Sequence, residues 1–184
     1  MKRIDFIQSV LGASAFIGLS LAACNDNKSL QDLVDNTSLK VNGSMFNFSC
    51  EKIEKVKVGI IGLGNRGSIL LQMFQYLVEQ EYAEIIALCD IQKNKTKNAS
   101  SLLSKWQKTN VSIYNSSEND WKELAKRDDI DLIIIATPWR LHAPMSLFCM
   151  ENDKHVACEV PIAYKLEDCW KLTQTSEKTK KHCI

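Results

Sequence analysis

The sequence predicts an α/β fold built on a doubly wound parallel sheet, and three observations lead to it. Apolar runs rich in Ile, Val and Leu alternate with amphipathic stretches from Lys55 onward. These runs do not alternate with polar residues, which is typical of parallel strands buried on both faces. The first run leads into a G-x-G-x-x-G pattern at Gly62, Gly64 and Gly67, the spacing of a tight strand-to-helix turn. Repeated strand–helix units with short connections imply right-handed crossovers, and therefore helices on both faces of one sheet.

The strands are expected in the apolar runs and the helices between them. The predicted strands are 55–61, 83–89, 111–114, 132–136 and 155–160. The predicted helices are 66–79, 93–108, 119–126, 141–151 and 166–182. Ser116-Ser117-Glu118 ahead of Trp121 is typical of a helix start, and Asp131 marks the beginning of the fourth strand.

Residues 1–24 are predicted to be an export signal rather than part of the fold. Lys2 and Arg3 give a positive start, 6–21 are mostly apolar, and Leu-Ala-Ala-Cys ends at Cys24. This pattern is typical of bacterial lipoproteins, in which the cysteine is acylated after cleavage. We therefore expect a lipid anchor on Cys24 in the cell envelope, facing the periplasm or the outside. A buried N-terminal helix is the alternative interpretation.

Composition divides the rest of the chain into a tether and a domain, and it argues against nucleic-acid binding and against a zinc site. Residues 25–53 are rich in Asn, Ser, Asp and Lys and are predicted to be a polar tether, whereas 54–184 form the folded domain. The formal net charge is +1 with both signs mixed, so nucleic acid is not an expected partner. The seven cysteines form no C-x-x-C pair, and Cys89 and Cys158 lie in apolar strand runs, so no zinc site is expected.

The glycine turn predicts a dinucleotide site. Gly62 permits the tight turn, Gly64 lets bare backbone approach a pyrophosphate, and Gly67 lets the helix pack close to the strand. The N–H groups that open the helix then bind the phosphates. Asp90 ends the second strand, where its carboxylate would accept the ribose hydroxyls of NAD and repel the 2′-phosphate of NADP. Without a cofactor, the same residues would be an ordinary helix start and a solvated acid.

The fourth strand ends in Ala136-Thr137-Pro138-Trp139-Arg140-Leu141-His142. Its carboxyl end is expected beside that of the first strand, at the switch point where open α/β sheets bind ligands. Pro138 fixes the turn, and Trp139 is placed to form a wall on the nicotinamide side. From spacing alone, His142 is a packing residue at the start of a helix.

Together these motifs resemble the glucose–fructose oxidoreductase and inositol dehydrogenase family of NAD(P)-dependent proteins. The resemblance covers residues 56–184, through GIIGLGNRG, LCD, ATPWRLHAPM and HVACEVPIA. Most dehydrogenases of that family carry Glu-Lys-Pro in the last motif, with the lysine beside the reacting hydroxyl. This chain has Glu159-Val160-Pro161, and valine exchanges no proton.

That difference narrows the resemblance to glycoside hydrolase family 109, whose described activity is that of an α-N-acetylgalactosaminidase. The resemblance implies transient oxidation of the sugar at C3 by NAD, elimination of the C1 group, hydration and return of the hydride, an exception among glycosidases. It also implies where NAD is bound besides the three glycines. These positions are Asn65, Arg66, Asp90, Trp139, Arg140, Leu141, His142, Glu159 and Val160.

The resemblance further implies that a sixth strand and an α+β substrate domain, with the catalytic residues, lie beyond Ile184. The small-molecule glycoside would bind there, and no catalytic residue is assigned to Tyr164 or His182. Apolar surface left uncovered favours association with a companion polypeptide or a second copy. Two other functions stay open: a sugar or polyol dehydrogenase, and a non-catalytic dinucleotide-binding module.

Overall fold

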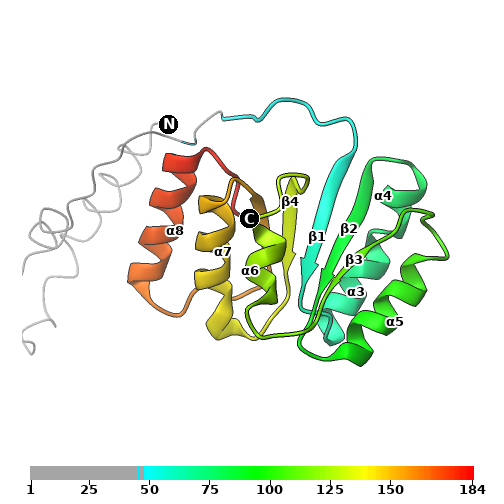
Figure 1. The fold of residues 1–184 in the computed structure, drawn as a ribbon. Helices are drawn as coiled ribbons and strands as arrows, with labels where there is room; N and C mark the ends of the chain where they lie inside the picture. The colour runs from blue at the N-terminus through cyan, green and yellow to red at the C-terminus, as the bar shows by residue number, and fades with distance from the viewer. Residues whose placement is uncertain (1–44, 46–47) are drawn as a thin grey trace, which may run out of the picture. The chain divides into compact units, whose positions relative to one another are not determined.

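A single parallel sheet organises the chain. The computed structural model describes Met45 and residues 48–184, all within one compact unit. The strands are β1 Val56–Ile61, β2 Ala83–Cys89, β3 Ser112–Tyr114, β4 Leu132–Ile135 and β5 His155–Cys158. They lie in the order β3-β2-β1-β4-β5 and all pair in parallel (Figure 1). The predicted doubly wound sheet is confirmed, and the order reverses between β1 and β4, which makes their carboxyl ends the switch point.

Helices cover both faces of the sheet. On one face lie α3 Asn65–Met73, α4 Gln75–Glu79 and α5 Lys93–Leu103, and on the other α6 Asp120–Ala125, α7 His142–Glu151 and α8 Leu166–Thr179 (Figure 1). In β4, Ile133 and Ile135 pack into one apolar cluster with Met150, whereas Ile134 packs into the opposite cluster with Leu71. Strand β4 therefore buries both of its faces, which explains its uninterrupted apolar run.

The end of α5 shows how tertiary contacts can end a helix earlier than its sequence predicts. The helix predicted over 93–108 ends at Leu103, and Gln107 then turns back toward β2. Its Nε2 donates to the carbonyl of Ile85 at 2.8 Å, and its Oε1 accepts from the Ile85 N–H at 3.0 Å. Gln107 is buried and satisfies the strand backbone where β3 does not reach, because β3 pairs only from Ala87 onward.

The last residues of the chain lie along the edge of the sheet, which corrects one expectation. We expected the last helix to run to His182. Instead α8 ends at Thr179, because Lys180 adopts a left-handed conformation with φ of 56°. The Val156 N–H then donates to the His182 carbonyl at 2.9 Å, and the Ile184 N–H donates to the Val156 carbonyl at 3.0 Å. Val156 and Cys183 thus form an isolated parallel bridge at the free edge of β5.

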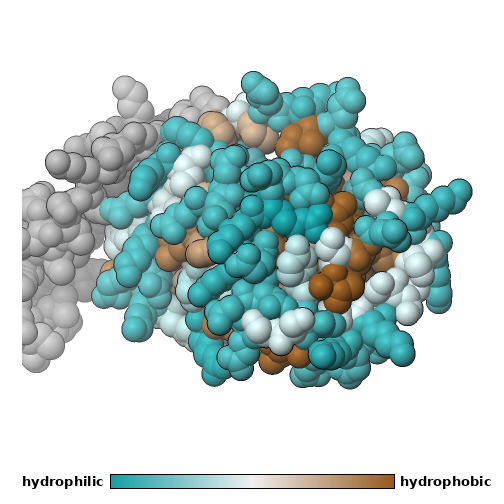
Figure 2. Space-filling model, in the orientation of Figure 1, coloured by the Kyte–Doolittle hydropathy of each residue, from teal (hydrophilic) through white to brown (hydrophobic). Residues whose placement is uncertain are grey.

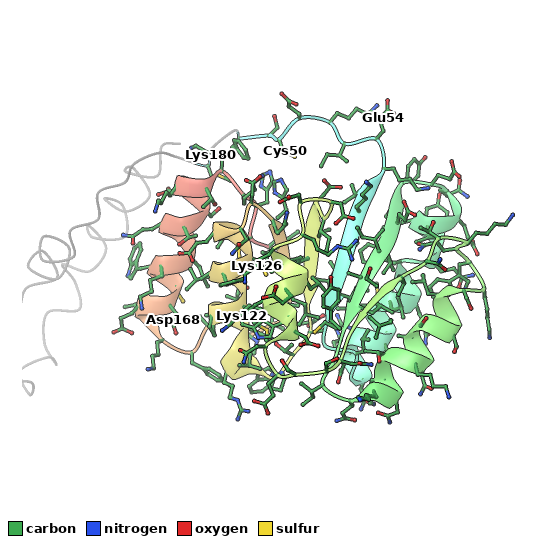
Figure 3. The ribbon with its side chains drawn as sticks, viewed as in Figure 1. Cys50, Glu54, Lys122, Lys126, Asp168 and Lys180 are labelled. Carbon is green, nitrogen blue, oxygen red and sulfur yellow. The ribbon has the colours of Figure 1, made fainter. Side chains whose placement is uncertain are left out.

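Exposed side chains mark the segment before β1 and the surface of α6, and Phe48 near the start of the described chain contacts His182. Cys50 and Glu54 project from the segment that leads into β1, Lys122 projects from α6, and Lys126 follows that helix as its C-cap residue (Figure 3). Before that segment, the Phe48 ring lies 5.2 Å from the His182 ring, so the end of the predicted tether contacts the domain. Figure 2 shows a mainly hydrophilic face with separate apolar areas.

The predicted export signal, including Cys24, and most of the tether lie outside the described residues. Within the part of the chain that the structure describes, no helix has the length and apolar character needed to span a bilayer.

Candidate cofactor site

The glycine turn joins β1 to α3 at the carboxyl edge of the sheet. Gly62 has φ of +90°, and a Cβ there would lie 2.6 Å from the Ala136 carbonyl oxygen, so only glycine fits. A Cβ on Gly67 would collide with the carbonyl oxygen of Gly62, which shows how closely α3 approaches the strand. At Gly64, by contrast, a Cβ would meet no atom within 4 Å among the described residues. The turn is closed on its protein side and open above Gly64.

The start of α3 presents backbone donors to this open space. Gly64 is the N-cap residue, and among residues 48–184 no side chain caps the helix and its first turn contains no acid. The first backbone bond inside the helix runs from the Ser68 N–H to the Gly64 carbonyl, at 2.9 Å. The N–H groups of Asn65, Arg66 and Gly67 therefore precede the ladder, and with the helix dipole they favour an anion. This open cradle fits a pyrophosphate.

Asp90 lies beside the turn, as expected from its place after β2. Its Oδ2 accepts from the Leu63 N–H at 2.7 Å, and its Oδ1 accepts from the Gln92 N–H at 2.8 Å. Each carboxylate oxygen keeps a further lone pair that can accept a ribose hydroxyl. The carboxylate thus ties the end of β2 to the glycine turn, and its predicted ribose contact stays a prediction.

Burial also raises the pKa of the thiol of Cys89, the residue before Asp90. Burial, followed by the charges of Asp120 and Asp90, raises the pKa of Cys89 to about 12. Burial likewise raises the pKa of Cys149 and Cys158 to about 12. These cysteines are neutral thiols at physiological pH, so none offers a thiolate nucleophile.

The segment after β4 forms the next part of the edge. Trp139, Arg140 and Leu141 make a 3₁₀ turn, η2, before α7 begins at His142. Trp139 is 56% exposed, and its ring centroid lies 6.1 Å from that of Tyr164. Arg140 is exposed, whereas Leu141 packs against the apolar cluster under α7. Of these three residues, Trp139 and Arg140 present side chains to the surface.

His142 is fully buried and joins two loops of the site. Its Nε2 lies 2.8 Å from the Thr137 carbonyl oxygen, and its Nδ1 lies 2.9 Å from the Pro161 carbonyl oxygen. The ring therefore connects the end of β4 to the loop after β5. The burial of the ring and its two backbone contacts fit the packing residue that its spacing suggested, and the contact with NAD that the resemblance implies stays a prediction. Sequence spacing gave no sign of the Pro161 contact.

The loop after β5 brings two predicted residues to the same edge. The Glu159 N–H donates to the Ile135 carbonyl at 2.9 Å, and its side chain pairs with Arg66 at 2.5 Å. Val160 is 77% exposed and precedes a cis peptide bond to Pro161. The structure thus brings the residues predicted after β1, β2, β4 and β5 to one edge of the sheet, although it does not test their contacts with a cofactor.

Several large apolar side chains are exposed around the ends of β4 and β5. They are Trp139, Val160, Tyr164, Leu166 and Trp170. The association of this surface with a second copy or a companion polypeptide stays a prediction.

Comparison with known proteins agrees with this geometry. Residues 56–184 match the family described as "Oxidoreductase family, NAD-binding Rossmann fold". The chain belongs to this family. NAD is accordingly its cofactor, and the glycine turn, the start of α3 and Asp90 are the groups suited to hold it.

Proteins with similar sequences belong to glycosyl hydrolase family 109. The chain is 39% identical to glycosyl hydrolase family 109 protein 1 of Bacteroides fragilis, over 92% of this chain and 37% of that protein. It is 44% identical to a family 109 protein of Porphyromonas gingivalis, over 72% of this chain and 28% of that protein. The resemblance to family 109 is therefore confirmed, and the chain spans about a third of the length of these relatives.

A solved structure supports the fold. The WlbA dehydrogenase of Chromobacterium violaceum, in complex with NADH and UDP-GlcNAcA, matches with a TM-score of 0.61 and 25% identity. The match covers 72% of this chain and 35% of that one.

Proposed function

We propose that this chain is the NAD-binding part of an exported glycosidase acting on an α-N-acetylgalactosaminide. The observation that carries the proposal is Val160, which stands 77% exposed between Glu159 and Pro161 at the carboxyl edge of the sheet. Its aliphatic side chain neither donates nor accepts a proton, whereas lysine at this position serves the related dehydrogenases. The family 109 relatives support the same assignment.

The proposed reaction is a net hydrolysis in which NAD is not consumed. When bound, NAD supplies a hydride acceptor that later returns the hydride. A ketone at C3 of the sugar makes the C2 proton acidic, so a base removes it and the group on C1 leaves. Water then adds at C1, a proton returns to C2, and C3 is reduced. One glycosidic bond and one water are consumed.

The residues of this chain bind and orient the cofactor in this scheme. The N–H groups at the start of α3 bind the pyrophosphate, and Asp90 holds the adenosine ribose. Trp139 shields the nicotinamide side, and His142 fixes the loops after β4 and β5 relative to each other. The acid or base is not assigned among the described residues.

An isotope experiment tests the proposal. The protein from its complete reading frame is incubated with nitrophenyl α-N-acetylgalactosaminide in D₂O. We expect release of nitrophenol, deuterium at C2 and no net NADH. Hydrolysis that continues undiminished after complete removal of NAD would contradict the mechanism.

A sugar dehydrogenase is the second candidate, favoured by the structural match to the WlbA dehydrogenase. It predicts that NADH accumulates with an alcohol substrate, which the glycosidase does not. A non-catalytic binding module, the third candidate, predicts NAD binding without either turnover.

We also propose a lipid anchor on Cys24 in the cell envelope, supported by the Leu-Ala-Ala-Cys sequence after an apolar run. Labelling with radioactive palmitate should mark the wild-type protein and not the Cys24→Ser variant. Equal labelling of both would contradict the anchor.

A further inference from the structure

A histidine at the start of β5 contacts the residues that follow α8. His155 is the first residue of β5, and its Nδ1 accepts a hydrogen bond from the His182 N–H at 3.0 Å. The two imidazole rings also stack, with their centroids 5.2 Å apart and an interplanar angle of 26°. Because Nδ1 accepts this bond, it carries no proton, and the proton of the neutral ring lies on Nε2. The contact therefore requires an uncharged His155.

This contact joins two segments to the edge of β5. The Val156 N–H donates to the His182 carbonyl at 2.9 Å, and the Ile184 N–H donates to the Val156 carbonyl at 3.0 Å. The His182 ring also lies 5.2 Å from the ring of Phe48, which belongs to the segment before β1. Three rings in succession thus connect the segment before β1 to β5, and His155 is the one that belongs to the strand.

Charged groups from several loops surround His155, which is half-buried and lines a cavity of about 130 Å³. The charged side chains that share this cavity lie just before β4 and after α6, α7 and α8; they are Asp128, Asp131, Asp153, Lys154 and Lys181. Burial, followed by the charges of Lys181 and His182, lowers the pKa of His155. The carboxylates of Asp131 and Asp153 oppose this effect without reversing it. His155 is therefore neutral near pH 7 and takes up a proton in mild acid.

A proton on Nδ1 turns the acceptor into a donor that faces another donor, so the bond from the His182 N–H is lost. We propose that His155 is a pH-sensitive switch: when its ring takes up a proton, residues 181–184 leave the edge of β5, and Phe48 loses the stack of rings that joins it to the strand. The backbone N–H and carbonyl of Val156 then lie unpaired at a sheet edge, where another extended segment can bind. This switch lies at the amino edge of the sheet and is independent of the cofactor site and of the proposed activity.

Amide hydrogen exchange on the 184-residue chain, followed by NMR and expressed as protection factors, tests the switch. Between about pH 7.5 and about pH 5.5, the protection of the His182 and Ile184 amides should fall severalfold, and by at most about tenfold for each pH unit, the limit for one proton. The Glu159 N–H donates to the Ile135 carbonyl, on the β4 side of β5, and should keep its protection as the internal reference. Equal protection of the His182 and Ile184 amides at both pH values would overturn the proposal.

Two variants identify the group that titrates. His155→Asn keeps an acceptor oxygen near the position of Nδ1 but takes up no proton, so the two amides should stay protected in acid. His182→Phe is the matched control, because it keeps the backbone N–H and a ring beside Phe48 and should respond to pH as the wild type does. An acid response that persists in His155→Asn, or one that disappears in His182→Phe, would contradict the assignment to His155.

A second measurement uses the wild-type protein alone and holds even if a variant does not fold. The ring ¹⁵N shifts of His155 should show a neutral ring protonated on Nε2 at about pH 7.5. Their titration should coincide with the loss of protection at Ile184. A ring protonated on Nδ1 at that pH, or a titration of His155 that leaves Ile184 protected, would overturn the switch.

Discussion

Replacing Gly64 by alanine separates cofactor binding from folding. Gly64 has φ of −66°, which alanine adopts without strain, and a Cβ there meets no described atom within 4 Å. Two small effects oppose each other: alanine is a poorer N-cap residue than glycine, but it loses less backbone entropy on folding. We expect a change in the free energy of unfolding within about 1 kcal/mol.

The same methyl group fills the space above the α3 donors. It should keep pyrophosphate oxygens from the N–H groups and weaken NAD binding by at least about tenfold, or about 1.4 kcal/mol. Calorimetry measures the affinity and urea unfolding the stability. Gly62→Ala is the contrasting variant, because φ of +90° and the contact with the Ala136 carbonyl should cost about 3 kcal/mol of stability. A folded Gly64→Ala protein with wild-type NAD affinity would refute the placement of the pyrophosphate.

Three further predictions concern single side chains. Asp90→Asn should lower the preference for NAD over NADP about tenfold, because the charge that repels the 2′-phosphate is removed. Titration of both proteins with both dinucleotides measures this preference. A wild-type protein that binds NADP more tightly than NAD would refute the placement of Asp90 beside the adenosine ribose. His142→Phe should lower the free energy of unfolding by about 1–3 kcal/mol in urea, because a backbone carbonyl loses the ring N–H that donates to it; unchanged stability would show that this contact contributes little. Burial, then the charges of Lys181 and His182, hold the pKa of His155 below 6.5 despite nearby carboxylates. The unfolded chain therefore takes up the proton first, so stability should fall as pH drops below about 6.5, and His155→Asn should flatten this slope in urea unfolding at several pH values.

Local sequence determined the elements that depend on nearest neighbours. The second strand was predicted at its observed bounds, Ala83–Cys89, because six of its seven residues are apolar or small and an uninterrupted apolar run of this length is typical of a buried strand. The glycine turn was also predictable, since Gly62 and Gly67 each answer a local steric demand that no other residue meets, whereas the space at Gly64 is open. Asp90 followed from its position at the end of that strand.

Tertiary structure decided the features that join distant residues. Gln107 ended α5 early because the backbone of Ile85 required partners, and His182 lies outside the helix predicted over 166–182 because the edge of β5 offered a hydrogen bond. The Arg66–Glu159 pair joins residues far apart in sequence, and the two carbonyls at His142 come from different loops. Periodicity reports which face of an element is buried, whereas these contacts depend on the order of strands in the sheet, which only the folded chain establishes.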